Sequence, residues 1–306
     1  MTNEFTPEQL EEMKDKFSAV QLACCAGSRQ FLDKEVVFGG VGISFLTVAI
    51  SKLLYTPSVI LMTEAGYVGF AGITSMNSPA DNAGAVGATL HQGLFDMFRD
   101  MQAGLVNAAC LGLAQIDKYG NANVTYVAPD VRMNGSGGGG DISCSAGRVV
   151  YVIKYASRTF QEKLDYMTNP GYLDGGSNAR EKAGLVGGGP ACIVSDRGIF
   201  RFDKTSREMV LAEVFPWQDE ADIEEIKSDV PWDLKIAPEL KIIAPPSEQE
   251  MAAIELMDPG KRYLEDDIVK RPASAIMLSG RSDLTAYRDL GAIFREKTEE
   301  AKKHLL

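Results

Sequence analysis

The stretch VILMTEAGYVGFAG, residues 59–72, holds the features that decide the fold. Its apolar opening predicts a short buried strand, and Thr63 and the acidic Glu64 follow that strand directly. Beyond Glu64, three glycines come within eight residues, so the carboxylate has neighbours with almost no side chain. Open α/β sheets bind ligands at the carboxyl ends of their parallel strands. Glu64 is therefore a candidate site residue, and the alternative is a solvated acid in a loop.

The surrounding pattern predicts an α/β fold. A strand at 36–40, a helix at 43–55 and a strand at 59–63 form a βαβ unit, which implies a parallel sheet. Further apolar strands are expected at 105–117 and 148–155. The later segments 191–203 and 207–215 are typical of an antiparallel hairpin and its extension. We expect a mainly parallel sheet flanked by helices, with an antiparallel hairpin extension.

Helices are expected at four other places, and the chain divides near its end. Capping boxes open the helices predicted at 7–29 and 247–258, and helical spacing also marks 89–104 and 219–230. Between them, residues 65–87 are rich in small residues and predict a long loop. No change of composition separates two domains before about residue 265. We therefore expect one domain over 1–264 and a helical tail over 265–306, whose apolar face packs on a partner subunit or on its own domain.

Composition limits the classes of function. The formal net charge of -11 argues against a nucleic-acid-binding protein, because phosphate backbones attract basic surfaces. No apolar run reaches the ~20 residues of a membrane span, and the polar N-terminus is no signal peptide. The five cysteines form no CxxC pair, and Cys110 and Cys192 lie in apolar runs that predict buried thiols. With two histidines in the chain, a histidine metal site is not expected. These features favour a cytoplasmic protein without a resident metal.

Two glycine segments are candidates for ligand contact. GGVG, residues 39–42, joins a strand to a helix, where backbone amides favour anions; the alternative is a plain tight turn. GSGGGG, residues 135–140, is called here the glycine run. Five glycines in six positions exceed the need of one turn, since each glycine costs ~0.5–1 kcal/mol of chain entropy. A backbone that passes close to a ligand explains them, and the alternative is a flexible linker.

Several motifs, in one order along the chain, resemble a known family. They are GGVGIS, YTPSVILMTEAG, AQIDKYGNAN, NGSGGGGD, KLDYMTNPGYLDG and IVSDRGIFRFD. Together they resemble the class I CoA-transferases, and in particular the β (B) subunit of glutaconate CoA-transferase. The resemblance extends to about residue 264. It implies a CoA-transferase that moves CoA from an acyl-CoA to a carboxylic acid, with no permanently bound cofactor.

The resemblance also implies roles for particular residues. Glu64 falls at the family's nucleophilic glutamate, which forms a mixed anhydride and then a glutamyl-CoA thioester. The turn Gly40, Val41 and Gly42 falls at the oxyanion-binding amides, and the loop Gly137, Gly138 and Gly139 falls beside the acyl-CoA. The site of the family lies between two homologous subunits, so the chain is expected to need an α subunit for activity. Residues 65–87 are the candidate for a loop that closes over the anhydride.

The sequence leaves open the reaction and the residues that bind the phosphates of CoA. A CoA-thioester hydrolase on the same fold, including a ring-opening C–C hydrolase, is the first alternative function, and a non-catalytic partner subunit is the second. For the phosphates of CoA, four cations after the glycine run are candidates, and the alternative is that they are ordinary surface charges. These cations are Arg148, Lys154, Arg158 and Lys163.

Overall fold

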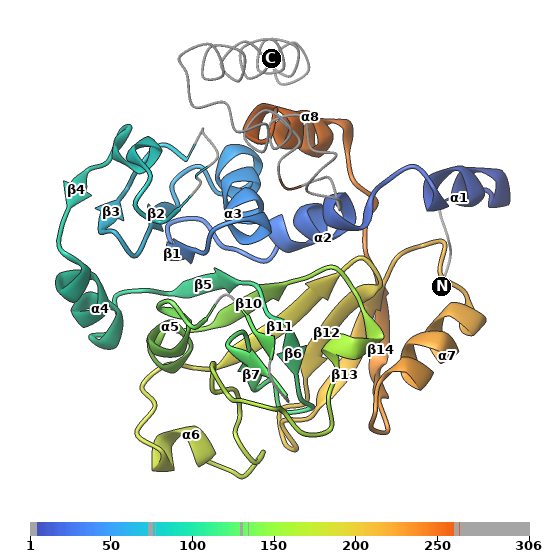
Figure 1. The fold of residues 1–306 in the computed structure, drawn as a ribbon. Coiled ribbons are helices and arrows are strands. Elements are labelled where there is room, and N and C mark those ends of the chain that lie inside the picture. Colours follow the sequence, from blue (N-terminus) through green and yellow to red (C-terminus); the bar gives the residue numbers. More distant parts are fainter. Residues whose placement is uncertain are drawn as a thin grey trace.

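A ten-stranded sheet forms the centre of the molecule (Figure 1). The computed structural model describes residues 5–72, 76, 78–128, 131–133, 135–259 and 263. The strand order is β14-β13-β12-β11-β10-β5-β1-β2-β3-β4. The strands are β1 (Val36–Gly39), β2 (Ile60–Met62), β3 (Tyr67–Val68), β4 (Leu90–His91), β5 (Ala108–Leu111), β10 (Val149–Val152), β11 (Pro190–Ser195), β12 (Gly198–Phe202), β13 (Met209–Val214) and β14 (Lys235–Ile242).

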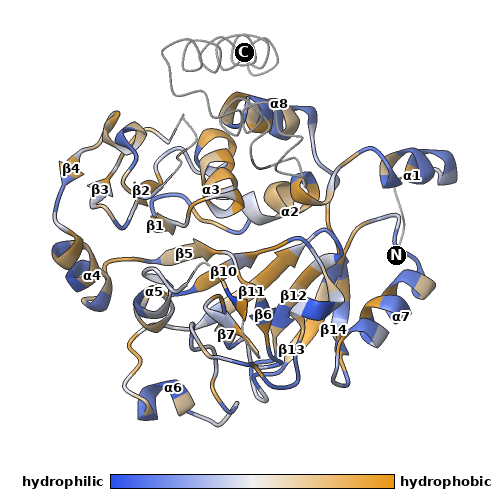
Figure 2. Cartoon of the chain, viewed as in Figure 1, coloured by the Kyte–Doolittle hydropathy of each residue, from blue (hydrophilic) through white to orange (hydrophobic). Residues whose placement is uncertain are grey.

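The middle of the sheet is parallel, as the βαβ pattern predicts. Strand β1 pairs with β2 on one side and with β5 on the other, and β10 pairs with β5 and β11, all in parallel. Every residue of β5 and of β10 is buried. Continuous apolar strands of this kind belong to sheets covered on both faces. Figure 2 shows these strands as the apolar centre of the molecule.

Both ends of the sheet are extended beyond the parallel core. The predicted antiparallel hairpin is confirmed, because β12 pairs antiparallel with both β11 and β13. Three strands of the sheet are absent from the sequence-based prediction. Strand β14 adds in parallel to β13, while β3 and β4 form an antiparallel edge next to β2. Two small sheets lie outside the main one: β6 (Gln115–Ile116) with β7 (Ala122–Asn123), and β8 (Tyr126–Val127) with β9 (Val131–Arg132).

Helices cover the two faces and enclose two apolar cores. The described helices are α1 (Pro7–Lys14), α2 (Ala19–Ser28), α3 (Ile43–Leu54), α4 (Leu94–Gln102), α5 (Gly139–Ser145), α6 (Ala179–Lys182), α7 (Glu220–Asp229), α8 (Glu248–Met257) and the 3₁₀ turns η1 (Asn82–Ala85) and η2 (Ser157–Thr159). Helices α2, α3 and α8 pack on one face and share one core. Helices α4, α5 and α7 contribute to the second core. In the described part of the chain, no helix is long and apolar enough to cross a membrane.

Three expected elements are wrong in extent. The helix predicted over 7–29 is two helices, because Ser18 forms its own capping box with Gln21 and starts α2 afresh. The helix predicted over 89–104 begins only at Leu94, since the residues before it pair with β3. The strand predicted over 105–117 is divided into β5 and β6 around Gly112. The helical tail predicted over 265–306 lies outside the described residues.

The long loop predicted over 65–87 is also wrong in part. Residues Gly66, Gly69 and Gly72 have φ of 87°, 70° and 70°, a left-handed conformation that favours glycine. These turns fold the chain back on β2, where Gly69 N–H donates to Leu61 O at 2.8 Å. Strand β3 and the turn η1 therefore interrupt the expected loop, and the rest of its described residues lie in turns and irregular structure. Among the described residues of this segment, Pro79 lines the cavity at the carboxyl edge of the sheet.

The buried cysteines behave as expected. Cys110 and Cys192 are 0% and 1% exposed, in β5 and β11. Burial raises the pKa of Cys192 to about 11 and raises the pKa of Cys110 as well. Thiols held neutral in this way are poor nucleophiles. These residues are part of the core and do not carry chemistry.

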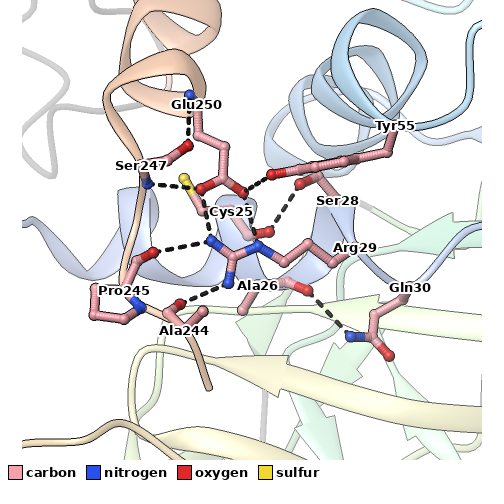
Figure 3. Close-up of polar contacts among 10 residues, drawn as sticks. All are labelled: Cys25, Ala26, Ser28, Arg29, Gln30, Tyr55, Ala244, Pro245, Ser247 and Glu250. Carbon is pink, nitrogen blue, oxygen red and sulfur yellow. Dashed lines mark hydrogen bonds and ion pairs between the residues drawn. The ribbon is translucent and has the colours of Figure 1, made fainter. Parts of the chain in front are cut away.

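An ion pair fixes α8 to the end of α2 (Figure 3). The Arg29 guanidinium donates to both carboxylate oxygens of Glu250, at 2.8 and 2.6 Å, and to the carbonyls of Ala244 and Pro245. The Tyr55 hydroxyl at the end of α3 donates to the same carboxylate at 2.7 Å. The Glu250 side chain is 0% exposed, so its charge depends on these donors. This cluster ties three helices together on one face of the sheet.

We predict that Glu250→Ala lowers the free energy of unfolding by about 3 kcal/mol, because removal of one member of a buried pair leaves the other charge uncompensated. The measurement is urea unfolding of the purified chain. Glu248→Ala is the matched control, since Glu248 is exposed in the first turn of the same helix, and it should cost less than about 1 kcal/mol. Equal losses in the two variants would contradict the prediction.

Candidate active site

A cavity of about 750 Å³ opens at the carboxyl ends of β1, β2 and β5. This is the edge at which parallel sheets bind ligands. The cavity brings together Glu64, both glycine segments and an apolar wall. Its lining is Phe38, Gly40, Val41, Glu64, Pro79, Leu111, Gly112, Leu113, Ala114, Val124, Met133, Gly135, Ser136, Gly137, Gly138, Gly139, Ile142 and Asn169.

Glu64 reaches this cavity from the turn after β2 and is held there by the glycine run. Its Oε1 accepts a hydrogen bond from Gly138 N–H at 2.6 Å. Its Oε2 accepts no hydrogen bond in the described part of the chain. Burial raises the pKa of the Glu64 carboxyl, and the Gly138 amide opposes this shift. One oxygen is thus anchored, while the other is left for a ligand.

The contact with Glu64 explains why position 138 is glycine. A Cβ at Gly138 would lie 2.1 Å from Glu64 Oε1 and 2.6 Å from the Phe98 ring of α4. Gly135 and Gly137 have φ of 90° and 47°, so the backbone turns in a region that side chains rarely adopt. The run then continues directly into α5. It is a structured turn onto a helix, not a linker.

The second glycine segment contributes Gly40 and Val41 to the cavity lining. Gly40 lines the cavity, but its N–H donates to Cys110 O at 3.0 Å and is already used. Val41 also lines the cavity, is 40% exposed, and its N–H donates to no acceptor among the described residues. Gly42, with φ of 88°, is the N-cap of α3 and is absent from the lining. Of the three expected residues, Val41 is the one whose amide can meet a ligand.

Arg180, which sequence reasoning missed, fixes the backbone beneath the site. Its side chain donates to the carbonyl oxygens of Ser143 and Cys144 in α5, and its other bonds reach Pro170, Gly171 and Gly187. Burial lowers the pKa of Arg180. A cation at the carboxyl end of a helix also complements the helix dipole. The guanidinium therefore joins the helix that follows the glycine run to the segment around Pro170.

Two buried asparagines of the motif AQIDKYGNAN form hydrogen bonds that hold neighbouring loops. Asn121 is 1% exposed and accepts hydrogen bonds from the N–H groups of Gly171 and Leu173, at 2.8 and 3.1 Å. It donates to Asp117 and to Leu173 O. Asn123 is 0% exposed, and its side-chain amide N–H donates to Gln115 Oε1 at 2.7 Å. The motif thus positions the loop that contributes Asn169 to the cavity lining, another residue that sequence reasoning did not single out.

The four cations proposed to bind the phosphates of CoA differ in their distance from the cavity and in their partners. Arg148 is paired with Glu35 and also donates to Gln30 O, so its charge serves the fold. Lys163 is exposed and lines neither cavity. Lys154 and Arg158 line a neighbouring cavity of about 810 Å³, which shares Gly112, Leu113, Ala114 and Met133 with the first. Two of the four are thus placed beside the site.

No group of three or more metal-ligating side chains occurs in the described ranges. His91 lies in β4 rather than in a helix, and its ring stacks on Tyr67 with 4.6 Å between ring centroids. Its role in the described structure is packing at the edge of the sheet.

The fold and the cavity define an α/β protein with a half-buried carboxylate in a cavity at the carboxyl edge of a parallel sheet. A sequence model of the coenzyme A transferase family matches residues 23–225. The chain therefore belongs to the coenzyme A transferase family, and the resemblance found in its motifs is confirmed. In the described structure, the matched range contains Glu64 and both glycine segments.

Individual relatives agree with this family. The chain is 30% identical over 247 residues to the B subunit of 3-oxoadipate CoA-transferase from Pseudomonas knackmussii, covering 79% of this chain and 94% of the relative. It is 28% identical over 248 residues to the B subunit of glutaconate CoA-transferase from Acidaminococcus fermentans, covering 78% and 91%. The crystal structure of the glutaconate enzyme superposes with a TM-score of 0.72 at 25% identity, over 82% of this chain and 99% of that chain.

A similar fold is found in a protein of different activity. The structure of the decarboxylase AibA/AibB matches with a TM-score of 0.64 at 21% identity, over 78% of this chain and 94% of that chain. This likeness shows the fold alone. The fold does not specify one reaction, and the chemistry depends on the residues in the cavity.

We predict that Gly138→Ala lowers kcat for CoA transfer by about 100-fold, because its Cβ would displace the Glu64 carboxylate. The backbone at Gly138 has φ of -82°, which alanine adopts freely, so the loss would come from the collision. Gly112→Ala is the control: Gly112 lines the same cavity, but its Cβ would meet nothing within 4 Å. The measurement is the steady-state kcat for CoA transfer. Equal kcat values for Gly138→Ala, Gly112→Ala and the wild type would contradict the prediction.

Proposed function

We propose that this chain is the B subunit of a heteromeric CoA-transferase and that Glu64 is its nucleophile. The observation that carries the proposal is the state of the Glu64 carboxylate. Its Oε1 is held by Gly138 N–H at 2.6 Å, while Oε2 accepts no hydrogen bond in the described structure. A nucleophile needs this combination of fixed orientation and an open lone pair.

The first half of the reaction transfers an acyl group to Glu64. Oε2 attacks the carbonyl carbon of an acyl-CoA thioester, and the carbonyl oxygen becomes an oxyanion. We assign the amide of Val41 as the donor to this oxygen, because Val41 lines the cavity and its N–H has no acceptor among the described residues. The C–S bond then breaks, and CoA leaves as its thiolate. The product is a mixed anhydride between the donor acid and Glu64.

The second step returns the thiolate to Glu64. The CoA sulfur attacks the glutamyl carbonyl carbon, whose oxygen is the one bonded to Gly138 N–H. That amide stabilises the second oxyanion, and one such donor is worth ~3–4 kcal/mol. The C–O bond of the anhydride breaks, the donor leaves as a carboxylate, and a glutamyl-CoA thioester remains. An acceptor carboxylate then runs both steps in reverse and regenerates Glu64.

The lining of the cavity supports an intermediate that water would destroy. Phe38, Leu111 and Ile142 are buried, and together with Leu113 they give the cavity an apolar wall. An apolar wall limits the access of water to an anhydride. We propose that a homologous α subunit completes this enclosure and that both subunits act in the cytoplasm. Two relatives are named as B subunits, and this supports the proposal of a partner subunit.

Transfer is favoured over hydrolysis by the relatives that match in sequence. The three relatives matched in sequence are named as CoA-transferases. A transferase needs an acceptor acid before free CoA is turned over, whereas a hydrolase releases CoA into water alone. Acetyl-CoA with glutaconate, 3-oxoadipate or caffeate as acceptor is the first panel to assay, because the relatives are named for these acids.

We predict that Glu64→Gln lowers transfer by at least about a thousandfold, because an amide cannot form the anhydride. The amide oxygen still accepts from Gly138 N–H, so the loop keeps its place. The measurement is the formation of the new CoA thioester by the complex of both subunits. Transfer at the wild-type rate by Glu64→Gln would contradict the proposal, as would CoA release that is independent of acceptor.

We also predict that Glu64→Gln stabilises the fold at neutral pH. Burial raises the pKa of Glu64 above its unfolded value, so the folded chain binds more protons than the unfolded chain between the two values. Stability therefore falls as pH rises through this window, and ionised Glu64 is unfavourable at pH 7. Urea unfolding should show the gain at pH 7 and its loss as the pH is lowered below the unfolded pKa. A variant less stable than the wild type at pH 7 would contradict this account.

A further inference from the structure

Asn169 is a buried amide in the wall of the cavity that contains Glu64. It is 1% exposed. Its N–H donates to Ala122 O, and its carbonyl accepts from Ala122 N–H, both at 2.9 Å. The proline that follows it is held by Arg180. The side chain therefore extends from a fixed backbone.

The side-chain oxygen of Asn169 lacks a partner. Its Oδ1 is buried and has no hydrogen bond among the described residues. The glycine run passes over it, because a Cβ at Gly139 would lie 2.9 Å from Oδ1. Burial raises the pKa of Tyr151, and a hydrogen bond with the Asn169 side chain opposes that shift, which is the sign that an amide N–H donor gives. The acceptor end of the amide is thus buried beneath Gly139 and has no hydrogen-bond partner among the described residues.

An acceptor in this position calls for a donor from outside the chain. Buried side-chain polar atoms are nearly always paired, and an unpaired one destabilises the fold. In ligand cavities, a small number of such atoms fix the orientation of the ligand. The described residues supply no donor to Oδ1, so a bound ligand is a candidate source of the N–H or O–H.

The substrate of the proposed function carries a suitable donor. The pantetheine arm of CoA has an amide N–H that is joined to the thioester sulfur by an ethylene unit. Consecutive residues of the glycine run contact the two groups concerned: Gly138 bonds to Glu64, and Gly139 covers Asn169. A thioester at Glu64 whose arm follows the glycine run would therefore bring its amide toward Asn169.

We propose that Asn169 is a positioning residue for acyl-CoA, whose Oδ1 accepts a hydrogen bond from this cysteamine N–H after a small displacement of the Gly139 backbone. The inference rests on the proposed function. It names a recognition contact on the thioester arm, which every acyl-CoA shares, and it is independent of the acyl group.

The test compares two thioesters that differ in one group. The complex of both subunits receives the acetyl thioester of N-acetylcysteamine or that of 2-acetoxyethanethiol, in which an ester oxygen replaces the N–H. Transfer goes to the acceptor acid that gives the highest rate in the panel above. We expect the wild type to prefer the amide by about 10-fold or more in kcat/KM, as for the loss of one buried hydrogen bond.

Variants of Asn169 test whether this residue causes the preference for the amide thioester. Asn169→Ala and the similarly shaped Asn169→Leu should bring the ratio to about one, while Asn169→Asp, which keeps an acceptor, should retain most of it. Asn107→Ala is the control, because Asn107 Oδ1 accepts from Val36 N–H at 2.8 Å outside the cavity lining. Mass and melting temperature of each complex identify variants that fail to assemble.

The outcomes separate this inference from the proposed function. Equal kcat/KM for the two thioesters in the wild type, or an unchanged preference in Asn169→Leu, overturns the role of Asn169 and leaves Glu64 untouched. Transfer by the wild type that does not exceed transfer by Glu64→Gln removes the proposed function, and the inference falls with it. A preference that is lost in Asn169→Ala and kept in Asn169→Asp and Asn107→Ala supports the inference.

Discussion

The hydrogen bond from Gly138 N–H to Glu64 Oε1 is the constraint on which the site depends. It joins two segments that are 74 residues apart in the chain. It leaves no room for a side chain at position 138, and it holds a carboxylate whose pKa is raised by burial. A single backbone donor opposes that burial only in part. Glu64 therefore has a fixed orientation and is less favourably solvated than a surface acid, as the proposed attack on a thioester requires.

The rest of the fold keeps the two ends of this contact in register. The parallel strands place the turn after β2 at the carboxyl edge of the sheet, next to Val41. On the other side, Arg180 binds the carbonyl end of α5, and Asn121 holds the loop that leads from Asn169. Both use buried side chains to satisfy backbone groups, which fixes loops that regular secondary structure does not. The polar residues of the family motifs thus act mainly as supports for the backbone.

The sequence predicted the features that depend on local patterns. The spacing of apolar residues and the turn residues between them predicted the βαβ unit and the hairpin at β11 and β12. They also predicted that Glu64 follows a strand and lies beside glycines. The structure confirms the fold. Features set by distant partners were missed. Strand β14 is largely exposed and has no apolar alternation, and β3 is too short to leave a pattern. Arg148 pairs with Glu35, which lies 113 residues away. Asn169 stands out because its buried Oδ1 has no hydrogen-bond partner among the described residues.

The most direct test of the account is to trap the covalent state of Glu64. The complex of both subunits is incubated with acyl-CoA, quenched with borohydride, digested and examined by peptide mass spectrometry. A glutamyl-CoA thioester is reduced to the alcohol, so the peptide that carries Glu64 should lose the mass that separates a carboxyl from a hydroxymethyl group. The account predicts this change at Glu64, dependent on acyl-CoA. An unmodified Glu64 peptide in a complex that actively transfers CoA would contradict it.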